Sequence, residues 1–192
     1  MDSIKAPPGN WACKVLSSRI PKTGEPYHEA FELALGAPIE HWGQQYAPSG
    51  PVKADVCFEF VNERVLAVVS VRAAFTLPCS RCLRETGVEA SGELKYLFSL
   101  RPTRDSAAPD GCGAPEEDGD VDVIQVDSFQ AELDVTQCVW EALLLSLPEG
   151  ALCSPDCEGL CPICGKDRNE GDCGCRYDDL DPRLAVLRGL DV

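Results

Sequence analysis

The spacing of the cysteines constrains this chain more than any other feature of its sequence. Six of the twelve cysteines fall between residues 153 and 175, in the pattern Cys-x3-Cys-x3-Cys-x2-Cys-x8-Cys-x-Cys. Within this run, Cys161-Pro162-Ile163-Cys164-Gly165 has the knuckle form, in which two thiolates turn toward one ion and the glycine permits a tight backbone. A second pair, Cys79 and Cys82, follows a predicted strand. Two such pairs supply the tetrahedral sulfur site that zinc prefers, so the pattern predicts structural metal binding.

The spacing leaves open how eight thiols would share the metal. The most local set is expected to hold one zinc ion: Cys161, Cys164, Cys173 and Cys175. The other four would complete a second structural zinc site that staples the tail to the sheet: Cys79, Cys82, Cys153 and Cys157. The alternatives are one ion held by Cys153, Cys157, Cys161 and Cys164, or a single occupied site with spare thiols. An iron–sulfur cluster uses the same ligands, so the residue types alone do not decide the metal.

The cysteines are expected to be reduced. Residues 1–20 contain no apolar run long enough for a signal sequence, and nothing downstream reaches the length of a membrane span. We therefore expect a cytoplasmic protein with no membrane partner, in a compartment that keeps thiols unpaired. A secreted disulfide protein is the weaker interpretation, because such domains are usually shorter and carry an export signal.

The sequence contains no evident catalytic constellation. Phosphate-binding loops, nucleophile elbows and metalloprotease helices are absent, and all-cysteine metal sites close the coordination shell. His28 and His41 have no nucleophile context and are expected on the surface. Cys79 and Cys82 could form a redox pair, but a strand on each side supplies no helix N-terminus to lower a thiol pKa. The isolated cysteines are expected to be small buried hydrophobes or ordinary loop thiols: Cys13, Cys57, Cys112 and Cys138.

Acidic residues are concentrated in the middle of the chain. Residues 1–104 hold 12 Lys/Arg against 11 Asp/Glu, whereas residues 105–165 hold 14 Asp/Glu and no Lys or Arg. Residues 166–192 hold 5 basic and 7 acidic residues, and the whole chain carries −15. Nucleic-acid binders rely on basic side chains that displace phosphate counterions, so the acidic segment disfavours direct RNA contact. A basic protein partner fits better, and the alternative is that the acidic residues only keep the protein soluble.

Alternating hydrophobicity predicts an antiparallel meander. Residues 52–60, 65–71 and 88–100 read as strands, and Asn62-Glu63 suits a hairpin turn between the first two. Shorter strands are expected at 30–35 and 121–126. The intervening residues 101–120 are rich in Pro, Gly, Ala, Ser and acid, which predicts a flexible acidic loop.

A helix is expected to cover this sheet. Asp134 can cap it with Gln137 as its capping-box partner, and Pro148 stops it. Asp181-Pro182 begins a short terminal helix that Gly189 can end. The expected fold is α+β: an antiparallel sheet, as a meander or partial barrel, covered by one long helix. Residues 1–150 would form the core domain, and residues 151–192 a cysteine-rich zinc-binding tail and terminal helix packed on it.

Four motifs in order resemble the YceD family of large ribosomal RNA accumulation proteins, over roughly residues 75–190. They are Cys79-Ser80-Arg81-Cys82-Leu83, the segment from Leu133 to Pro148, the run from Leu152 to Gly165, and the segment from Asp181 to Leu187. After Gly165 many members have asparagine-leucine-asparagine one residue later, whereas this chain has Asp167-Arg168-Asn169. The resemblance implies a role in the accumulation, processing or stability of 23S rRNA, and it implies no catalytic residue.

We therefore expect a non-catalytic accessory of ribosome biogenesis that supports 23S rRNA through a basic ribosomal protein or assembly factor. One alternative is an RNA-binding protein that uses a zinc ribbon, although residues 151–192 hold 5 basic against 9 acidic residues. Another alternative is a thiol redox enzyme that uses Cys79 and Cys82.

Overall fold

The computed structural model describes residues 3–101, 121–129 and 132–175. It divides into two compact units. Unit 1 comprises Met1–Leu77 and Gly87–Ala151, and unit 2 comprises Pro78–Thr86 and Leu152–Val192. The expected terminal helix and the expected loop from residue 102 onward lie outside the described residues. The packing of the tail on the core stays a prediction.

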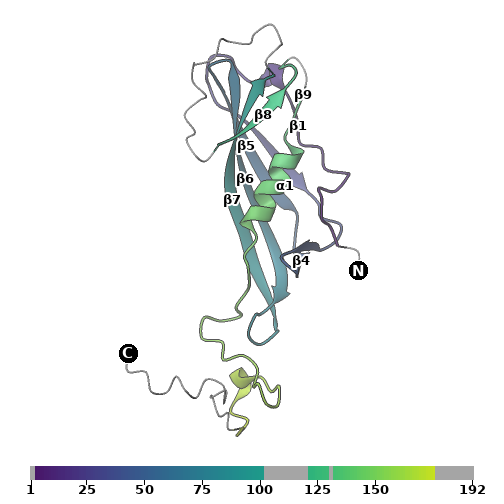
Figure 1. Ribbon diagram of the computed structural model, residues 1–192, viewed down its shortest axis with the longest axis vertical. Coiled ribbons are helices and arrows are strands. Elements are labelled where there is room, and N and C mark those ends of the chain that lie inside the picture. Colours follow the sequence, from purple (N-terminus) through teal and green to yellow (C-terminus); the bar gives the residue numbers. More distant parts are fainter. Residues whose placement is uncertain (1–2, 102–120, 130–131, 176–192) are drawn as a thin grey trace, which may run out of the picture. The chain divides into compact units, whose positions relative to one another are not determined.

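A seven-stranded sheet forms the framework of unit 1. Its strands are β2 (Tyr27–Leu33), β3 (Ile39–His41), β4 (Gln44–Pro48), β5 (Val52–Val61), β6 (Arg64–Pro78), β7 (Glu85–Leu100) and β8 (Val121–Val126). The hydrogen-bonded order is β2-β5-β6-β4-β3, and β7 joins β6 to β8. The predicted three-stranded meander is therefore present as β5, β6 and β7 (Figure 1), and β2 extends it by pairing with β5.

The alternation that predicted these strands corresponds to alternating burial. Along β5, Val52, Ala54 and Val56 are buried, while Lys53 and Asp55 between them are exposed. β6 continues the pattern for 15 residues, and its buried members line the same core. Asn62 and Glu63 adopt positive φ values of 48° and 61°, the left-handed conformation of a two-residue hairpin turn. Val61 therefore pairs with Arg64, and the predicted turn is confirmed.

One pair of strands departs from the expected antiparallel arrangement. β8 pairs with β7 in parallel, with Lys95 opposite Val121 and Leu100 opposite Val126. Parallel neighbours need a long crossover, and here 20 residues separate the end of β7 from the start of β8. The sheet is thus mixed. This was not predicted, because alternation of apolar and polar residues indicates a strand but not whether it runs parallel or antiparallel to its neighbour.

Several short elements near the N-terminus were not predicted. β1 (Lys14–Leu16) pairs with β9 (Glu132–Asp134) in a small separate sheet, and a 3-10 turn covers Ser17–Arg19. β3 and β4 form a hairpin around Trp42 and Gly43, which have φ values of 50° and 74°. Strands of three residues carry too little alternation to stand out in the sequence.

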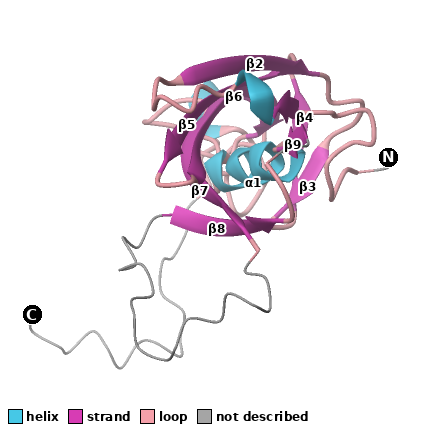
Figure 2. Cartoon of the chain, turned by 90° about the horizontal axis from the view of Figure 1, so that it is seen from above, coloured by secondary structure: helices cyan, strands magenta, loops and turns pink. Residues whose placement is uncertain are grey.

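The helix α1 (Thr136–Ser146) packs against the concave side of the sheet. Seen from above, the strands lie around it (Figure 2). Its N-cap is Val135 and not Asp134, but the Asp134 carboxylate still accepts a hydrogen bond from the Thr136 N–H at 2.9 Å. The helix has 11 residues, which is shorter than expected, and it ends before Leu147 and Pro148 as predicted.

Polar groups and aromatic rings fix this helix in the core. The Tyr96 hydroxyl on β7 donates to the Cys138 carbonyl at 3.3 Å and lies 3.0 Å from Glu141 Oε2. Trp140 meets Trp11 edge to face, with 5.7 Å between ring centroids. The described residues contain no buried side-chain nitrogen or oxygen without a hydrogen-bond partner. None of the described helices combines the length and apolar character that a membrane crossing requires.

The close approach of α1 to β7 can be tested at Gly92. A Cβ at this position would lie 2.9 Å from Ser146 Cβ, whereas a Cβ at Gly87 in the same strand would have no atom within 4 Å. Gly92→Ala is expected to lower the free energy of unfolding by about 1–3 kcal/mol, because overpacking forces the helix away from the sheet. Urea denaturation measures this change. Gly87→Ala is the control and is expected to change stability by about 0.5 kcal/mol or less. Equal losses for both variants would contradict the packing described.

Candidate metal centre

Unit 2 brings two segments that are distant in sequence to the same cluster of sulfurs. Residues 78–86 contain the turn between β6 and β7, and the segment from Leu152 onward follows α1. Leu160 N–H donates to the Arg81 carbonyl at 3.1 Å, and the Arg81 guanidinium donates to the Cys157 carbonyl at 2.8 Å. Gly159, with φ 74°, lies so close that a Cβ there would come 2.9 Å from the Arg81 carbonyl oxygen. Glycine is therefore required where the two segments cross.

The first group of sulfurs is named site A and comprises Cys79, Cys82, Cys153 and Cys157. Their Sγ atoms all lie within 4.8 Å of one another. Cys79 Sγ is 3.9 Å from Cys157 Sγ, and Cys82 Sγ is 3.5 Å from Cys153 Sγ. A tetrahedral site with zinc–sulfur bonds of about 2.3 Å has sulfurs about 3.8 Å apart. The spacing of site A therefore fits a single tetrahedrally bound ion.

The second group is named site B and comprises Cys161, Cys164, Cys173 and Cys175. Its four Sγ atoms also lie within 4.8 Å of one another. The knuckle is closed by Gly165 N–H donating to the Cys161 carbonyl and Cys161 N–H donating to the Lys166 carbonyl, both at 2.8 Å. Gly165 has φ 73°, as the motif predicted. Site A is largely buried, whereas Cys164 of site B is exposed.

The eight cysteines thus fall into the two groups expected from the sequence, and the rival set of Cys153, Cys157, Cys161 and Cys164 is not the one brought together. Whether either group holds a metal stays a prediction at this point. All-sulfur tetrahedral groups suit zinc or iron and leave no open position for a substrate.

Backbone amides favour the thiolate form at the first cysteine of each knuckle. Hydrogen bonds from the backbone N–H groups of Cys82, Arg81 and Cys153 lower the pKa of Cys79 to about 6. The equivalent amides of Cys164 and Ile163 lower the pKa of Cys161 to about 6. Thiolates are the form that binds metal, so both knuckles are arranged for ligation.

One other sulfur in each group, Cys153 in site A and Cys175 in site B, has a pKa that shifts in the opposite direction. Hydrogen bonding with Cys82 is the first cause that raises the pKa of Cys153 to about 12, and Cys164 does the same for Cys175. Four thiolates crowded together repel one another, and a divalent cation would relieve that repulsion.

The knuckle of site A contains a backbone feature that the sequence did not reveal. Leu83 occupies the position equivalent to Gly165 and has φ 61°. Its side chain is 64% exposed, so no burial offsets the unfavourable conformation. The turn is held by Cys79 N–H donating to the Arg84 carbonyl and Leu83 N–H donating to the Cys79 carbonyl, at 2.8 and 3.0 Å.

Sequence reasoning also missed the side chains that support site A. Asn169 Nδ2 lies 3.4 Å from Cys157 Sγ, and Arg84 forms an ion pair with Asp167 at 3.1 Å. Asn169 matches the last asparagine of the YceD triplet, whereas Asp167 and Arg168 depart from it. Neither the match nor the departure indicated what these residues contact.

The three isolated cysteines that the structure describes, Cys13, Cys57 and Cys138, belong to neither group of sulfurs. Cys13 and Cys138 are buried in the core of unit 1, where burial raises their pKa values to about 11 and about 12. Cys57 is half-buried on β5, and Cys112 lies outside the described residues. Buried neutral thiols of this kind pack as small hydrophobes.

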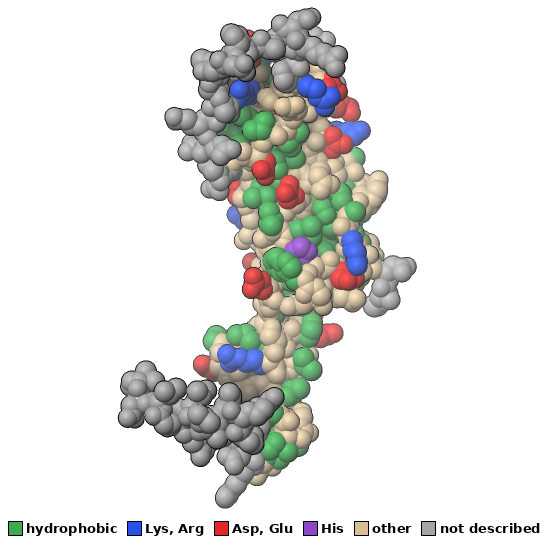
Figure 3. Space-filling view, viewed as in Figure 1, with side chains coloured by type: hydrophobic (Ala, Val, Ile, Leu, Met, Phe, Trp, Pro, Cys, Tyr) green, Lys and Arg blue, Asp and Glu red, His purple; other side chains and the backbone are tan. Residues whose placement is uncertain are grey.

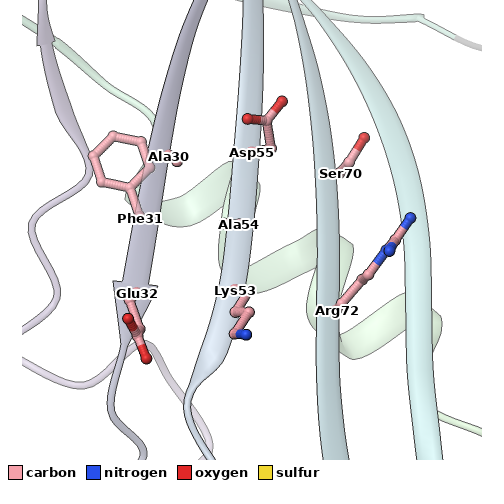
Figure 4. A pocket seen from close by; sticks show the side chains of 8 residues that line it. All are labelled: Ala30, Phe31, Glu32, Lys53, Ala54, Asp55, Ser70 and Arg72. Atoms are coloured by element: carbon pink, nitrogen blue, oxygen red, sulfur yellow. The ribbon is translucent and has the colours of Figure 1, made fainter.

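The grooves of unit 1 offer no catalytic arrangement among the described residues. One groove of about 680 Å³ lies across β2, β5 and β6, and the charged ends of Lys53, Asp55 and Arg72 point apart in it (Figure 4). His28 is exposed and lies 3.2 Å from Asp55, but Ser70 in the same groove donates to Glu93 at 3.1 Å. Histidine and hydroxyl are therefore not paired as a base and a nucleophile would be.

Basic side chains form no continuous patch on the face shown in Figure 3. There, the Lys and Arg side chains of the described residues are scattered and interleaved with Asp and Glu. Among the described residues, Lys5 forms an ion pair with Glu40, and Arg84 forms one with Asp167. Binding of a nucleic-acid backbone normally requires a clustered basic surface.

Comparison with known proteins identifies relatives. A family model described as "Large ribosomal RNA subunit accumulation protein YceD" matches residues 67–191. An uncharacterized protein of Mycobacterium tuberculosis is 34% identical over 133 residues, which are 69% of this chain and 58% of that protein. A protein of Arabidopsis thaliana named "Large ribosomal RNA subunit accumulation protein YCED homolog 1, chloroplastic" is 23% identical over 172 residues, covering 82% of this chain and 54% of the relative. No solved structure matches.

The chain spans 54% to 58% of the length of these relatives. The region matched by the family model includes β7, α1 and all eight cysteines of sites A and B. It covers more than half of the chain and bears out the resemblance drawn from the four motifs. The chain therefore belongs to the YceD family of large ribosomal RNA subunit accumulation proteins.

Proposed function

We propose that this protein is a non-catalytic accessory of ribosome biogenesis, which supports the synthesis, processing or stability of 23S rRNA in the cytoplasm. The observation that carries the proposal is the family match over residues 67–191, since the family is described by large ribosomal RNA subunit accumulation and not by a reaction. The plant relatives in Arabidopsis and maize carry the same description in their names.

Both cysteine groups are proposed to bind zinc as a structural ion. Each offers four sulfurs, which close a tetrahedral shell and leave no position for a reacting water or substrate. Zinc bound in this way would supply folding energy to unit 2, whose described core consists of the sulfur cluster and Leu160. Cys79 and Cys82 then act as ligands and not as a redox pair.

The proposed partner is a basic ribosomal protein or assembly factor. Residues 105–165 provide 14 acidic and no basic residues, a charge that attracts a cationic surface and repels RNA. Tetrathiolate zinc sites would add further negative charge. Direct RNA binding is the second candidate, and the scattered basic side chains give it little support.

The metal content tests the first part of this proposal. Purified full-length protein is expected to contain two zinc ions per chain by elemental analysis. Cys161→Ser is expected to leave one, because each site needs all four sulfurs for tight binding. The control Cys57→Ser removes a half-buried thiol outside both groups and is expected to leave two. Iron in place of zinc, or no metal in freshly prepared protein, would contradict the assignment.

The rRNA pool tests the cellular role. Depletion of the protein is expected to lower the ratio of 23S to 16S rRNA, measured by quantitative hybridisation, and full-length protein is expected to restore it. An unchanged ratio would contradict the proposed function.

The mode of action is tested with purified components. Capture by a basic ribosomal protein or assembly factor should weaken as salt rises, because charge complementarity governs the encounter. Strong, salt-dependent binding of the isolated protein to 23S rRNA fragments would favour the RNA-binding alternative. Turnover that disappears in Cys79→Ser while the fold is preserved would favour an enzyme.

A further inference from the structure

The loop that connects two cysteines of site B contacts a sulfur of site A. Residues 165–172 connect Cys164 to Cys173 and so lie wholly between two ligands of site B. The middle of this loop forms a 3-10 turn over Arg168–Glu170. From this turn, Asn169 extends its side-chain amide to Cys157, a sulfur of site A, with 3.4 Å between Nδ2 and Sγ. An amide N–H directed at a sulfur stabilises negative charge on it.

Several hydrogen bonds fix the Asn169 side chain in this orientation. Its Oδ1 accepts the Glu158 N–H at 2.9 Å, next to Cys157 in the chain. Its Nδ2 is also 2.6 Å from Asp167 Oδ1, and that same oxygen accepts the Asn169 N–H at 2.9 Å. These bonds determine which end of the amide is the donor, so the nitrogen faces the sulfur.

The same loop also contacts residues 78–86, the other segment that supplies sulfurs to site A. Asp167 Oδ2 pairs with Arg84 at 3.1 Å, and Arg84 supplies the carbonyl that closes the Cys79–Cys82 turn. Arg168 N–H donates to the Gly159 carbonyl at 2.9 Å, between ligands Cys157 and Cys161. The Asp167 side chain is 17% exposed, and its partner Arg84 is 55% exposed. One short loop thus contacts both segments that supply the sulfurs of site A.

We propose that Asn169 is a positioning residue for the Cys157 thiolate and that it couples the two metal sites. An ion in site B orders the loop between Cys164 and Cys173, and the ordered loop directs the Asn169 amide at site A. Occupancy of site B therefore raises the affinity of site A. Linkage requires that occupancy of site A raises the affinity of site B by the same factor. This inference rests on the metal binding proposed above and is independent of the cellular role.

The expected change in metal affinity is taken from hydrogen-bonded groups that orient metal ligands in other proteins. Loss of a hydrogen-bonded group that orients a ligand typically reduces metal affinity about 10- to 100-fold. Asn169 contributes one such bond to one of four sulfurs, so a loss near the lower end of that range is expected. The ordering of an otherwise unsupported loop by its own metal accounts for the coupling.

Cobalt(II) titration of the full-length protein measures each site through thiolate-to-metal charge-transfer absorption. Site A is followed alone in a chain that carries Cys164→Ala and Cys175→Ala, and again in a chain with site B intact. With site B intact, Asn169→Ala is expected to weaken site A about tenfold. In the chain that lacks site B, the same replacement is expected to have little effect, because the loop is not held in place.

Two variants separate the hydrogen bond from other effects. Asn169→Asp keeps the acceptor for the Glu158 N–H but cannot donate to sulfur, so it should weaken site A at least as much as Asn169→Ala and shift its charge-transfer band. Lys166→Ala is the matched control in the same loop. Among the described residues, the Lys166 side chain hydrogen-bonds only to the Asp172 carbonyl, at 3.5 Å, and the replacement keeps the Lys166 backbone carbonyl that closes the site B knuckle. It should leave both sites unchanged, and circular dichroism checks that all variants fold.

The possible outcomes separate this inference from the proposals before it. An Asn169→Ala loss of the same size with and without site B would overturn the coupling. No loss in either background would overturn the positioning role as well. A wild-type chain that gives no charge-transfer absorption would overturn metal binding itself, while leaving the 23S rRNA depletion test unaffected.

Discussion

The approach of four sulfurs in each group determines the structure of unit 2. Its described residues bury little apart from four cysteines, Cys79, Cys82, Cys157 and Cys161, and Cys153 and Leu160 pack against the first three. An apolar core of that size cannot offset the conformational entropy lost when loops become ordered. The binding energy of an ion held tetrahedrally by the four sulfurs would offset it. Two features of the backbone bring the sulfurs together: the close approach of Gly159 to Arg81, and the N–H groups directed at the Cys79 sulfur.

Unit 1 is stabilised by the burial of alternating apolar residues, and much of its structure was therefore predictable from the sequence. Alternation of apolar and polar residues is a local signal, so β5, β6 and β7 and the turn at Asn62 follow from the sequence. The end of α1 before Pro148 also followed from the sequence. The parallel pairing of β8 did not, because direction depends on a long connection whose path no local pattern encodes. β1 and β3 are defined by their partners in the sheet more than by their own residues.

The candidate metal centre shows the same division. Local spacing grouped Cys161 with Cys164, Cys173 and Cys175, and elimination grouped the remaining four sulfurs. The residues around the sulfurs had no comparable signal. Asn169 reads as an ordinary loop asparagine, and Leu83 reads as an apolar residue where the fold places it in a conformation that suits glycine. Asn169 has its role through a side-chain contact with Cys157, 12 residues away in the sequence, and Leu83 through the turn from Cys79 to Arg84. The spacing of the cysteines reports neither contact.

The ligands of site A come from either side of a long stretch of chain. Cys82 precedes β7 and Cys153 follows α1, so an ion held by both would close a loop of 70 intervening residues. Such a closure restricts the denatured ensemble, and its entropic effect grows with the logarithm of the loop length. Zinc in a unit that contributes almost nothing to the apolar core would then limit how far that core can expand when it melts.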